Sequence, residues 1–159
     1  QNDALYDDLS GKENLVFFGS LMGLTGTALD RAIEKNMQLV DLLDFLNKPV
    51  KTYSGGMKRR LSLAITLLSN PDLFVLDEPT VGIDPSLRVA IWEQLRELAN
   101  NNKGIIMTTH VMDEAEKCDY VGLIIEGKLF AFGSPKELEE QFKVTSIEEV
   151  FLKAEVNAK

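Results

Sequence analysis

Two acidic residues follow a short apolar run, and they are the first candidates for chemistry in this sequence. The run 73–76 leads directly into Asp77 and Glu78. If the run is a strand of a parallel sheet, both acids stand at its carboxyl end, where such sheets present ligand-binding groups. Metal-assisted phosphoryl transfer has a use for each: Asp77 would hold Mg²⁺, directly or through water, and Glu78 would polarise an attacking water. The alternative is a strand that leads into a solvated acidic turn.

A serine followed by two glycines is the second feature. Ser54, Gly55 and Gly56 stand at the start of a helical pattern. Glycines leave backbone N–H groups unobstructed at the positive end of the helix dipole, which suits an anion such as a phosphate. The alternative is a serine N-cap with a flexible turn.

The single histidine is the third candidate. His110 follows an apolar run at an expected corner between a strand and a helix. One interpretation is an ordinary polar residue at that corner. A metal pair with Glu114, one helical turn further on, is a weak alternative because two ligands on a short helix make a poor site.

The order of these features resembles the ATPase domain of ABC transporters. Segment 53–57 resembles the signature motif, 76–80 the Walker B strand, 82–85 the D-loop and 108–110 the switch histidine. Gln1 resembles the Q-loop glutamine, and 2–24 resembles the start of the helical subdomain. The resemblance covers nearly the whole chain. It implies an α/β fold of the P-loop NTPase type with an α-helical subdomain, without the N-terminal strands and the Walker A loop.

The resemblance assigns roles to the candidate residues. Ser54, Gly55 and Gly56 would contact the γ-phosphate of ATP bound by a second ATPase domain in a head-to-tail dimer. Asp77 would serve Mg²⁺, and Glu78 would be the general base.

Three further residues receive roles in the same way. His110 would hold the γ-phosphate, and Gln1 would touch the metal or its water and relay closure to a transmembrane permease subunit. Asp84 would communicate across the dimer interface. By function the chain then divides into a Q-loop and signature part (1–70), an α/β core (71–133) and C-terminal helices (134–159).

The sequence departs from this family at several points. Tyr53 stands where leucine is common and Met57 where glutamine is common. No G-x-x-x-x-G-K-[ST] segment is present, nor is the upstream aromatic residue that stacks on adenine. We therefore expect a piece of a larger protein that cannot bind ATP tightly by itself. Missing strands would also expose sheet edges and apolar surface, which favours self-association or marginal stability.

The periodicity predicts helices followed by an α/β layer. Ser10 and Glu13 form a capping box, the next helix runs from about Thr27 to Leu46, and a third begins at Ser54. Later elements are a buried strand over 73–77, a helix opened by Asp84 and Pro85, a strand over 105–108, a short helix over 111–117, a hairpin of 120–125 and 128–132, and helices opened by Ser134 and by Ser146.

Composition limits the class of protein. Acids outnumber bases by 25 to 17 in 159 residues, and the one basic cluster, 58–60, is too short for a nucleic-acid surface. Cys118 is the only cysteine, which excludes an internal disulfide. No apolar run is long enough to span a bilayer, so a membrane role requires a partner, with the chain at the cytoplasmic face.

The C-terminal part bears on the kind of ABC protein. Segments 133–138 and 146–152 resemble the end of ATPase subunits from drug-, polysaccharide- or lipid-exporting systems. The alternative is that they are simply two amphipathic helices that close the domain. The other functions to consider are a soluble ABC ATPase of the translation-factor kind and a non-catalytic dimerisation module.

Overall fold

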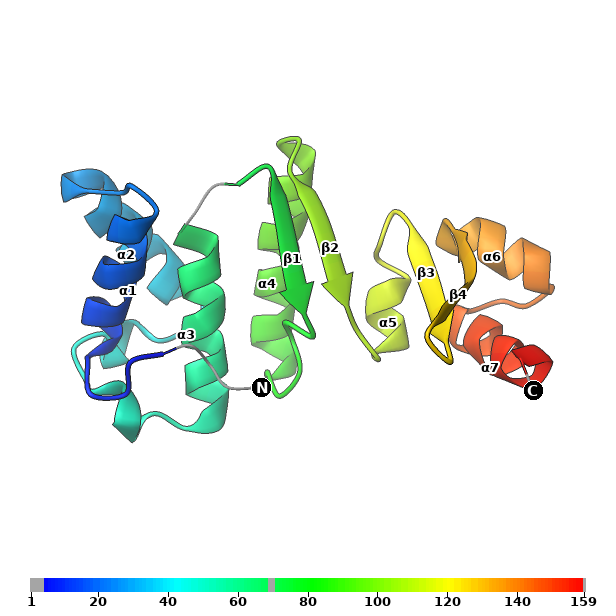
Figure 1. Ribbon diagram of the computed structural model, residues 1–159, viewed down its shortest axis with the longest axis horizontal. Helices are drawn as coiled ribbons and strands as arrows, with labels where there is room; N and C mark the ends of the chain where they lie inside the picture. The colour runs from blue at the N-terminus through cyan, green and yellow to red at the C-terminus, as the bar shows by residue number, and fades with distance from the viewer. Residues whose placement is uncertain (1–4, 69–70, 159) are drawn as a thin grey trace. The chain divides into compact units, whose positions relative to one another are not determined.

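The computed structural model describes residues 5–68 and 71–158. The chain divides into two compact units, Gln1–Thr108 and Thr109–Lys159. The described part of the first unit contains a group of helices and a pair of parallel strands, and that of the second contains a β-hairpin with three helices (Figure 1). The division at 70 and 133 proposed above is functional and stays a prediction.

Three α-helices form the start of the first unit: α1 (Gly11–Leu21), α2 (Gly26–Leu39) and α3 (Gly55–Leu68). The predicted capping box of α1 is confirmed, since Ser10 Oγ accepts from Glu13 N at 3.2 Å and Ser10 N donates to the Glu13 carboxylate at 2.7 Å. Two short 3₁₀ turns, η1 (Leu43–Phe45) and η2 (Val50–Thr52), lead from α2 into α3.

The prediction that the second helix reaches Leu46 is wrong, because α2 ends at Leu39. Asp41 adopts a φ of 53°, and the N–H of Leu42 reaches back to the carbonyl of Met37 at 2.9 Å, which is a Schellman ending. Arg60 of α3 donates to the carbonyl of Val40 at 3.0 Å. The apolar spacing continues past this point because the following turns also send residues into the core.

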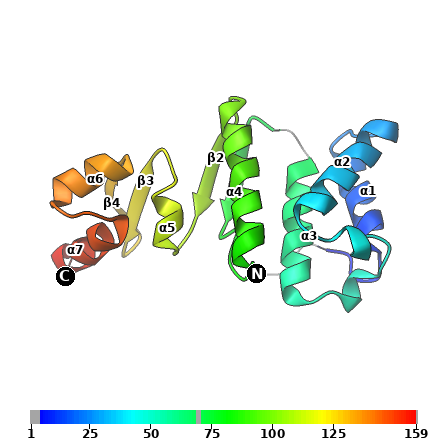
Figure 2. The same cartoon turned by 180° about the vertical axis from the view of Figure 1, so that it is seen from behind.

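Strands β1 (Leu73–Asp77) and β2 (Gly104–Thr108) pair in parallel, with Asp77 opposite Thr108. Helix α4 (Pro85–Asn100) connects them and covers one face of the pair, which is best seen from behind in Figure 2. Asp84 caps α4 and Pro85 is its first residue, as predicted.

The expectation that strand 73–77 is buried is wrong for one of its faces. Phe74 is 2% exposed, whereas Val75 is 72% exposed. Ile106 of β2 is also exposed, at 57%. Side chains alternate between the two faces of a strand, and only the face covered by α4 is buried. This apolar surface agrees with the expectation of an uncovered sheet.

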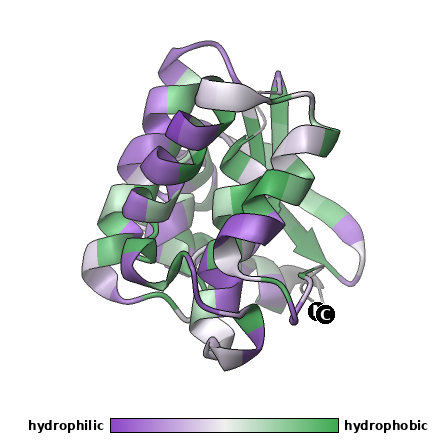
Figure 3. Cartoon of the chain, turned by 90° about the vertical axis from the view of Figure 1, so that its left-hand side faces the viewer, coloured by the Kyte–Doolittle hydropathy of each residue, from purple (hydrophilic) through white to green (hydrophobic). Residues whose placement is uncertain are grey.

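One hydrophobic core joins the helices and strands of the first unit. Figure 3 looks onto the helical end of this unit, where hydrophilic and hydrophobic residues share each helix, as expected for helices with one buried face. The fully buried members of this core include Leu15, Met37, Val40, Leu42, Val50, Leu61, Ala64 and Ile91.

The second unit is built around a hairpin of β3 (Val121–Ile125) and β4 (Lys128–Gly133). Glu126 and Gly127 have φ values of 49° and 74°, which is the predicted tight hairpin turn. Helices α5 (Met112–Ala115), α6 (Pro135–Phe142) and α7 (Ile147–Ala158) complete the unit, and α5 is shorter than predicted. Among the described residues, no helix has the length and apolar character needed to cross a membrane.

Candidate active site

The two acids lie at the carboxyl end of β1, as the sequence predicted. Thr108, at the end of the neighbouring strand, donates its hydroxyl to Asp77 Oδ1 at 2.5 Å. The N–H of Glu78 points to the same residue, 3.1 Å from the carbonyl and 3.0 Å from Oγ1 of Thr108. The end of β2 therefore fixes both a side-chain oxygen of Asp77 and the backbone of Glu78.

Glu78 occupies an unusual backbone conformation. Its φ is 45°, in the left-handed region that non-glycine residues seldom adopt. Its carbonyl accepts from Val81 N at 3.3 Å, and Ile83 N donates to the carbonyl of Thr80 at 3.2 Å. These bonds form the tight turn that carries the chain from β1 to α4. Strained backbone of this kind is concentrated at functional sites.

The segment 54–56 forms the N-terminal tip of α3. Ser54 Oγ accepts from Met57 N at 3.2 Å and so acts as the N-cap. A Cβ on Gly55 would meet no atom within 4 Å, and one on Gly56 would lie 3.7 Å from the carbonyl oxygen of Gly82. The tip is therefore open, and it faces the turn that follows the acids.

Tyr53 anchors this tip in the core. Its ring is buried, and its hydroxyl donates to the carbonyl of Phe45 at 2.6 Å. Burial raises the pKa of the phenol. The tyrosine that replaces the leucine common in the family thus packs as a core residue and leaves Ser54 exposed.

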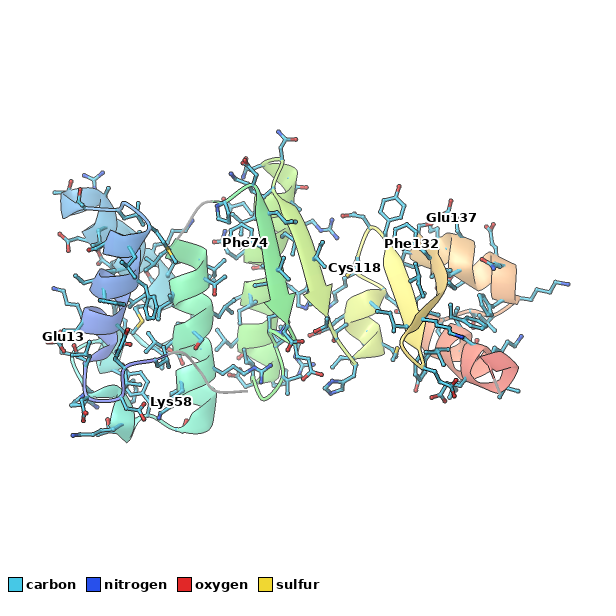
Figure 4. All side chains as sticks on the ribbon, viewed as in Figure 1. Glu13, Lys58, Phe74, Cys118, Phe132 and Glu137 are labelled. Carbon is cyan, nitrogen blue, oxygen red and sulfur yellow. The ribbon has the colours of Figure 1, made fainter. Side chains whose placement is uncertain are left out.

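The acids and the helix tip lie at the same end of the first unit. The carboxyl ends of β1 and β2 and the first turns of α3 and α4 all point toward the lower edge of Figure 1. Arg59 connects α3 to the end of β1. Its Nη2 donates to the carbonyl of Glu78 and, at 3.4 Å, to that of Asp77. In Figure 4 the labelled Lys58 marks α3 and the labelled Phe74 marks β1, the two elements that Arg59 connects.

Asp84 caps the first turn of α4 through its side chain. Its Oδ1 accepts from the Ser86 hydroxyl at 2.7 Å and from Leu87 N at 3.0 Å. The Ser86 hydroxyl, followed by the Leu87 amide, lowers the pKa of this carboxyl. Asp84 is exposed and holds the first turn of α4 next to the acid-bearing turn.

His110 belongs to the second unit, where its side chain is exposed. The neighbouring Thr109 donates its hydroxyl to Glu114 Oε2 at 2.7 Å, and Glu114 is 1% exposed. Glu114 is therefore a buried, hydrogen-bonded residue of its unit. The described residues contain no group of three metal-binding side chains. Gln1 lies outside the described residues, so the site described consists of 54–56, 77–78 and their neighbours.

Sequence reasoning missed Arg59 and Thr108. In the sequence, Arg59 stands out only as part of the short basic cluster 58–60. Thr108 could have been found from the expected parallel pairing, because the last residues of two adjacent strands stand side by side. Arg59 has no comparable signal, since its contact depends on how α3 packs beside β1.

The residues present fit Mg²⁺ and a nucleotide phosphate. Mg²⁺ is typically held by one or two carboxylates together with phosphate oxygens and waters. Asp77 is exposed and offers such a carboxylate, with one oxygen oriented by Thr108. The first N–H groups of α3 have no acceptor within the helix, and the glycines leave space for an anion to approach them.

Comparison with known proteins agrees with this geometry. The family model described as "ABC transporter" matches residues 1–81. ABC transporter A family members 5 and 10 of Arabidopsis thaliana are 43% and 44% identical over 145 residues, which is 89% of this chain. The chain spans only 15% and 16% of the length of these two relatives.

A solved structure has the same fold. It is described as "Structure of ATP binding subunit of ABC transporter", and it matches 95% of this chain and 64% of its own with a TM-score of 0.87 and 27% sequence identity. The α/β fold of ABC ATPases expected from the sequence is thereby confirmed. This chain belongs to the ABC transporter family, as part of its ATP-binding domain.

Proposed function

We propose that this chain supplies the signature segment and the hydrolytic acids of an ATPase that powers export across a membrane. One observation carries the proposal: the open tip 54–56 and the acids Asp77 and Glu78 lie at the same end of one unit, with Gly56 next to the Gly82 carbonyl. Two segments that both suit phosphate chemistry are thus held by one core.

The two segments would serve two different nucleotides. Ser54, Gly55 and Gly56 would donate to the γ-phosphate of ATP held by a second ATPase domain, because these three residues are exposed. Glu78 would orient the water that attacks the nucleotide of its own domain, while Asp77 would hold Mg²⁺. The metal, when bound, offsets the charge that develops on the phosphate oxygens.

The remaining candidates complete the site in this proposal. His110 would hold the γ-phosphate, Asp84 would stand at the interface of the two domains, and Gln1 would link the site to a transmembrane permease subunit. Opening and closing of the dimer would then move the permease.

A longer protein would provide the missing phosphate-binding loop. The printed sequence contains no G-x-x-x-x-G-K-[ST] segment. The relatives are six to seven times longer than the matched region, and the solved ATP-binding subunit is longer as well. The relatives are named as ABC transporters, which supports a transporter over a soluble ATPase. The C-terminal segments 133–138 and 146–152 support export, at the cytoplasmic face of the membrane.

Replacing Glu78 tests the catalytic part of the proposal. In the full-length protein, Glu78→Gln should abolish ATP turnover while ATP binding is retained. Glu93→Gln, which changes an exposed acid on α4, is the control and should leave turnover unchanged. Hydrolysis at the normal rate by Glu78→Gln would remove Glu78 from its role.

A titration of the isolated chain tests the need for the missing loop. Labelled ATP should bind with an affinity weaker than millimolar, because most of the affinity would come from that loop. Sub-millimolar affinity of the isolated chain would contradict this part of the proposal.

A further inference from the structure

We infer that Arg59 of α3 is a positioning residue that holds Glu78 in place. The inference rests on the proposed function, in which Glu78 orients the attacking water. Arg59 touches the backbone of Glu78 and needs no contact with the nucleotide. It would make the position of Glu78 depend on the position of α3.

The contacts of Arg59 lie at the point where the acid pair leaves the sheet. Its Nη2 donates to the carbonyl of Glu78 and to that of Asp77, the second at 3.4 Å. Arg59 lies in the second turn of α3 and is half-buried, so that its guanidinium is partly screened from water. Hydrogen bonds from a charged donor are stronger than those between neutral groups.

Glu78 requires this support because of its backbone conformation. A residue other than glycine at a φ of 45° is strained and persists only where neighbours fix it. Thr108 fixes the N–H of Glu78, at 3.0 and 3.1 Å. On the carbonyl side, Val81 N is a neutral donor at 3.3 Å, and Arg59 is the charged one. Without Arg59, the backbone of Glu78 is held mainly through its N–H, by Thr108.

The neighbours of Arg59 point elsewhere and provide a matched control. Lys58 forms an ion pair with Asp7 at 2.7 Å. Arg60 donates to the carbonyl of Val40 at 3.0 Å and thereby closes the end of α2. Within this run of three basic residues, Arg59 donates to the carbonyls of Asp77 and Glu78 at the end of β1.

This arrangement has a mechanical consequence. Ser54, the N-cap of α3, would contact the nucleotide of the partner domain, and five residues later the helix carries Arg59, which holds Glu78. A movement of α3 when its tip meets a γ-phosphate would reach Glu78 through one side chain. The two nucleotide sites of the dimer would be coupled within each domain.

The test uses Arg59→Met, Arg59→Lys and Lys58→Met in the full-length protein. We measure kcat and KM for Mg-ATP together with ATP binding. Arg59→Met should lower kcat about tenfold or more, with less than about a threefold change in KM, because it removes a charged hydrogen bond without removing a nucleotide contact. Arg59→Lys, which keeps a charged donor, should recover most of kcat. Lys58→Met should hydrolyse ATP at the normal rate.

A double variant separates positioning from a general loss of structure. If Arg59 acts through Glu78, Arg59→Met should not lower further the residual single-turnover rate of Glu78→Gln. Normal kcat in Arg59→Met, an equal loss in Lys58→Met, or multiplied losses in the double variant would each overturn the inference. If Arg59→Met does not fold, Arg59→Gln replaces it under the same criteria.

The outcomes distinguish this inference from the proposed function. Inactive Glu78→Gln together with normal Arg59→Met refutes only the role of Arg59. Normal hydrolysis by Glu78→Gln refutes the proposed function and the inference with it.

Discussion

Removal of the Thr108 hydroxyl is a direct perturbation of the acid pair. That hydroxyl donates to Asp77 Oδ1 at 2.5 Å and accepts from Glu78 N at 3.0 Å. Thr108→Val keeps the shape and the β-branching of the side chain, so the strand should retain its pairing. Both contacts to the acids are lost, while Glu78 N still reaches the Thr108 carbonyl at 3.1 Å.

The size of the effect follows from these contacts. A hydrogen bond to a charged group contributes about 1.5–3 kcal/mol. Asp77 and Thr108 are both exposed, so water replaces part of the bond and we expect about 1 kcal/mol. If that energy is lost from the orientation of the metal ligand during hydrolysis, kcat falls about fivefold.

The assay is ATP hydrolysis by the full-length protein over a range of Mg²⁺ concentrations. Thr108→Val should need more Mg²⁺ for half-maximal activity and should reach a lower maximum. Thr108→Ser keeps the hydroxyl and should behave like the unaltered protein. An unchanged Mg²⁺ requirement and kcat in Thr108→Val, or an equal loss in Thr108→Ser, would refute the reasoning.

Two further predictions concern stability. In denaturant unfolding of the isolated chain, Phe74→Ala should lower the free energy of unfolding by about 3–5 kcal/mol. Val75→Ala, on the exposed face of β1, should lower it by less than about 0.5 kcal/mol. Equal losses would contradict the assignment of the two faces. The backbone and then the hydroxyl of Ser10 lower the pKa of Glu13, and those of Ser134 do the same for Glu137. A carboxyl whose pKa is lowered in the folded state adds stability that is complete above the pKa of the unfolded state. This stability is lost as the pH falls through the pKa of the folded state. The midpoint of denaturant unfolding should therefore move to lower denaturant concentration below about pH 4.5. Ser10→Ala should weaken this dependence, and a pH-independent curve between about pH 6 and pH 3 would contradict it.

Local chemistry made much of the fold predictable. Ser10, Asp84 and Ser134 each cap a helix through a residue three positions later, so the signal lies within one turn of sequence. Glu126 and Gly127 specify a hairpin turn for the same reason. The position of Asp77 and Glu78 at the end of a strand also follows from a run of six residues.

Contacts between distant parts of the chain were not predictable in this way. The end of α2 also receives a hydrogen bond from Arg60, which is 20 residues away from Val40. Thr108 reaches Asp77 across 31 residues, and Arg59 reaches Glu78 across 19. Such contacts arise from the packing of whole elements, which residue spacing alone does not encode.

The exposed face of β1 and β2 shows a different limit. Apolar residues at 73, 75 and 106 favour a strand that is buried on both sides, and a parallel sheet usually is. In this chain α4 covers one face only, so Leu73, Val75 and Ile106 remain exposed. The residue types were those of a buried strand, but burial also requires an element to cover the second face.

The central claim is that the exposed tip of α3 contacts a nucleotide in the closed dimer. Its most direct test is the rate at which a thiol reagent labels Ser54→Cys in full-length protein that also carries Glu78→Gln, with Glu34→Cys on the exposed surface of α2 as the reference. Mass spectrometry of the labelled peptides reports each position separately. We predict that Mg-ATP slows labelling at position 54 at least about tenfold and leaves position 34 unchanged, because the phosphate would cover the open amides of the tip. Equal labelling at position 54 with and without bound Mg-ATP would contradict the claim.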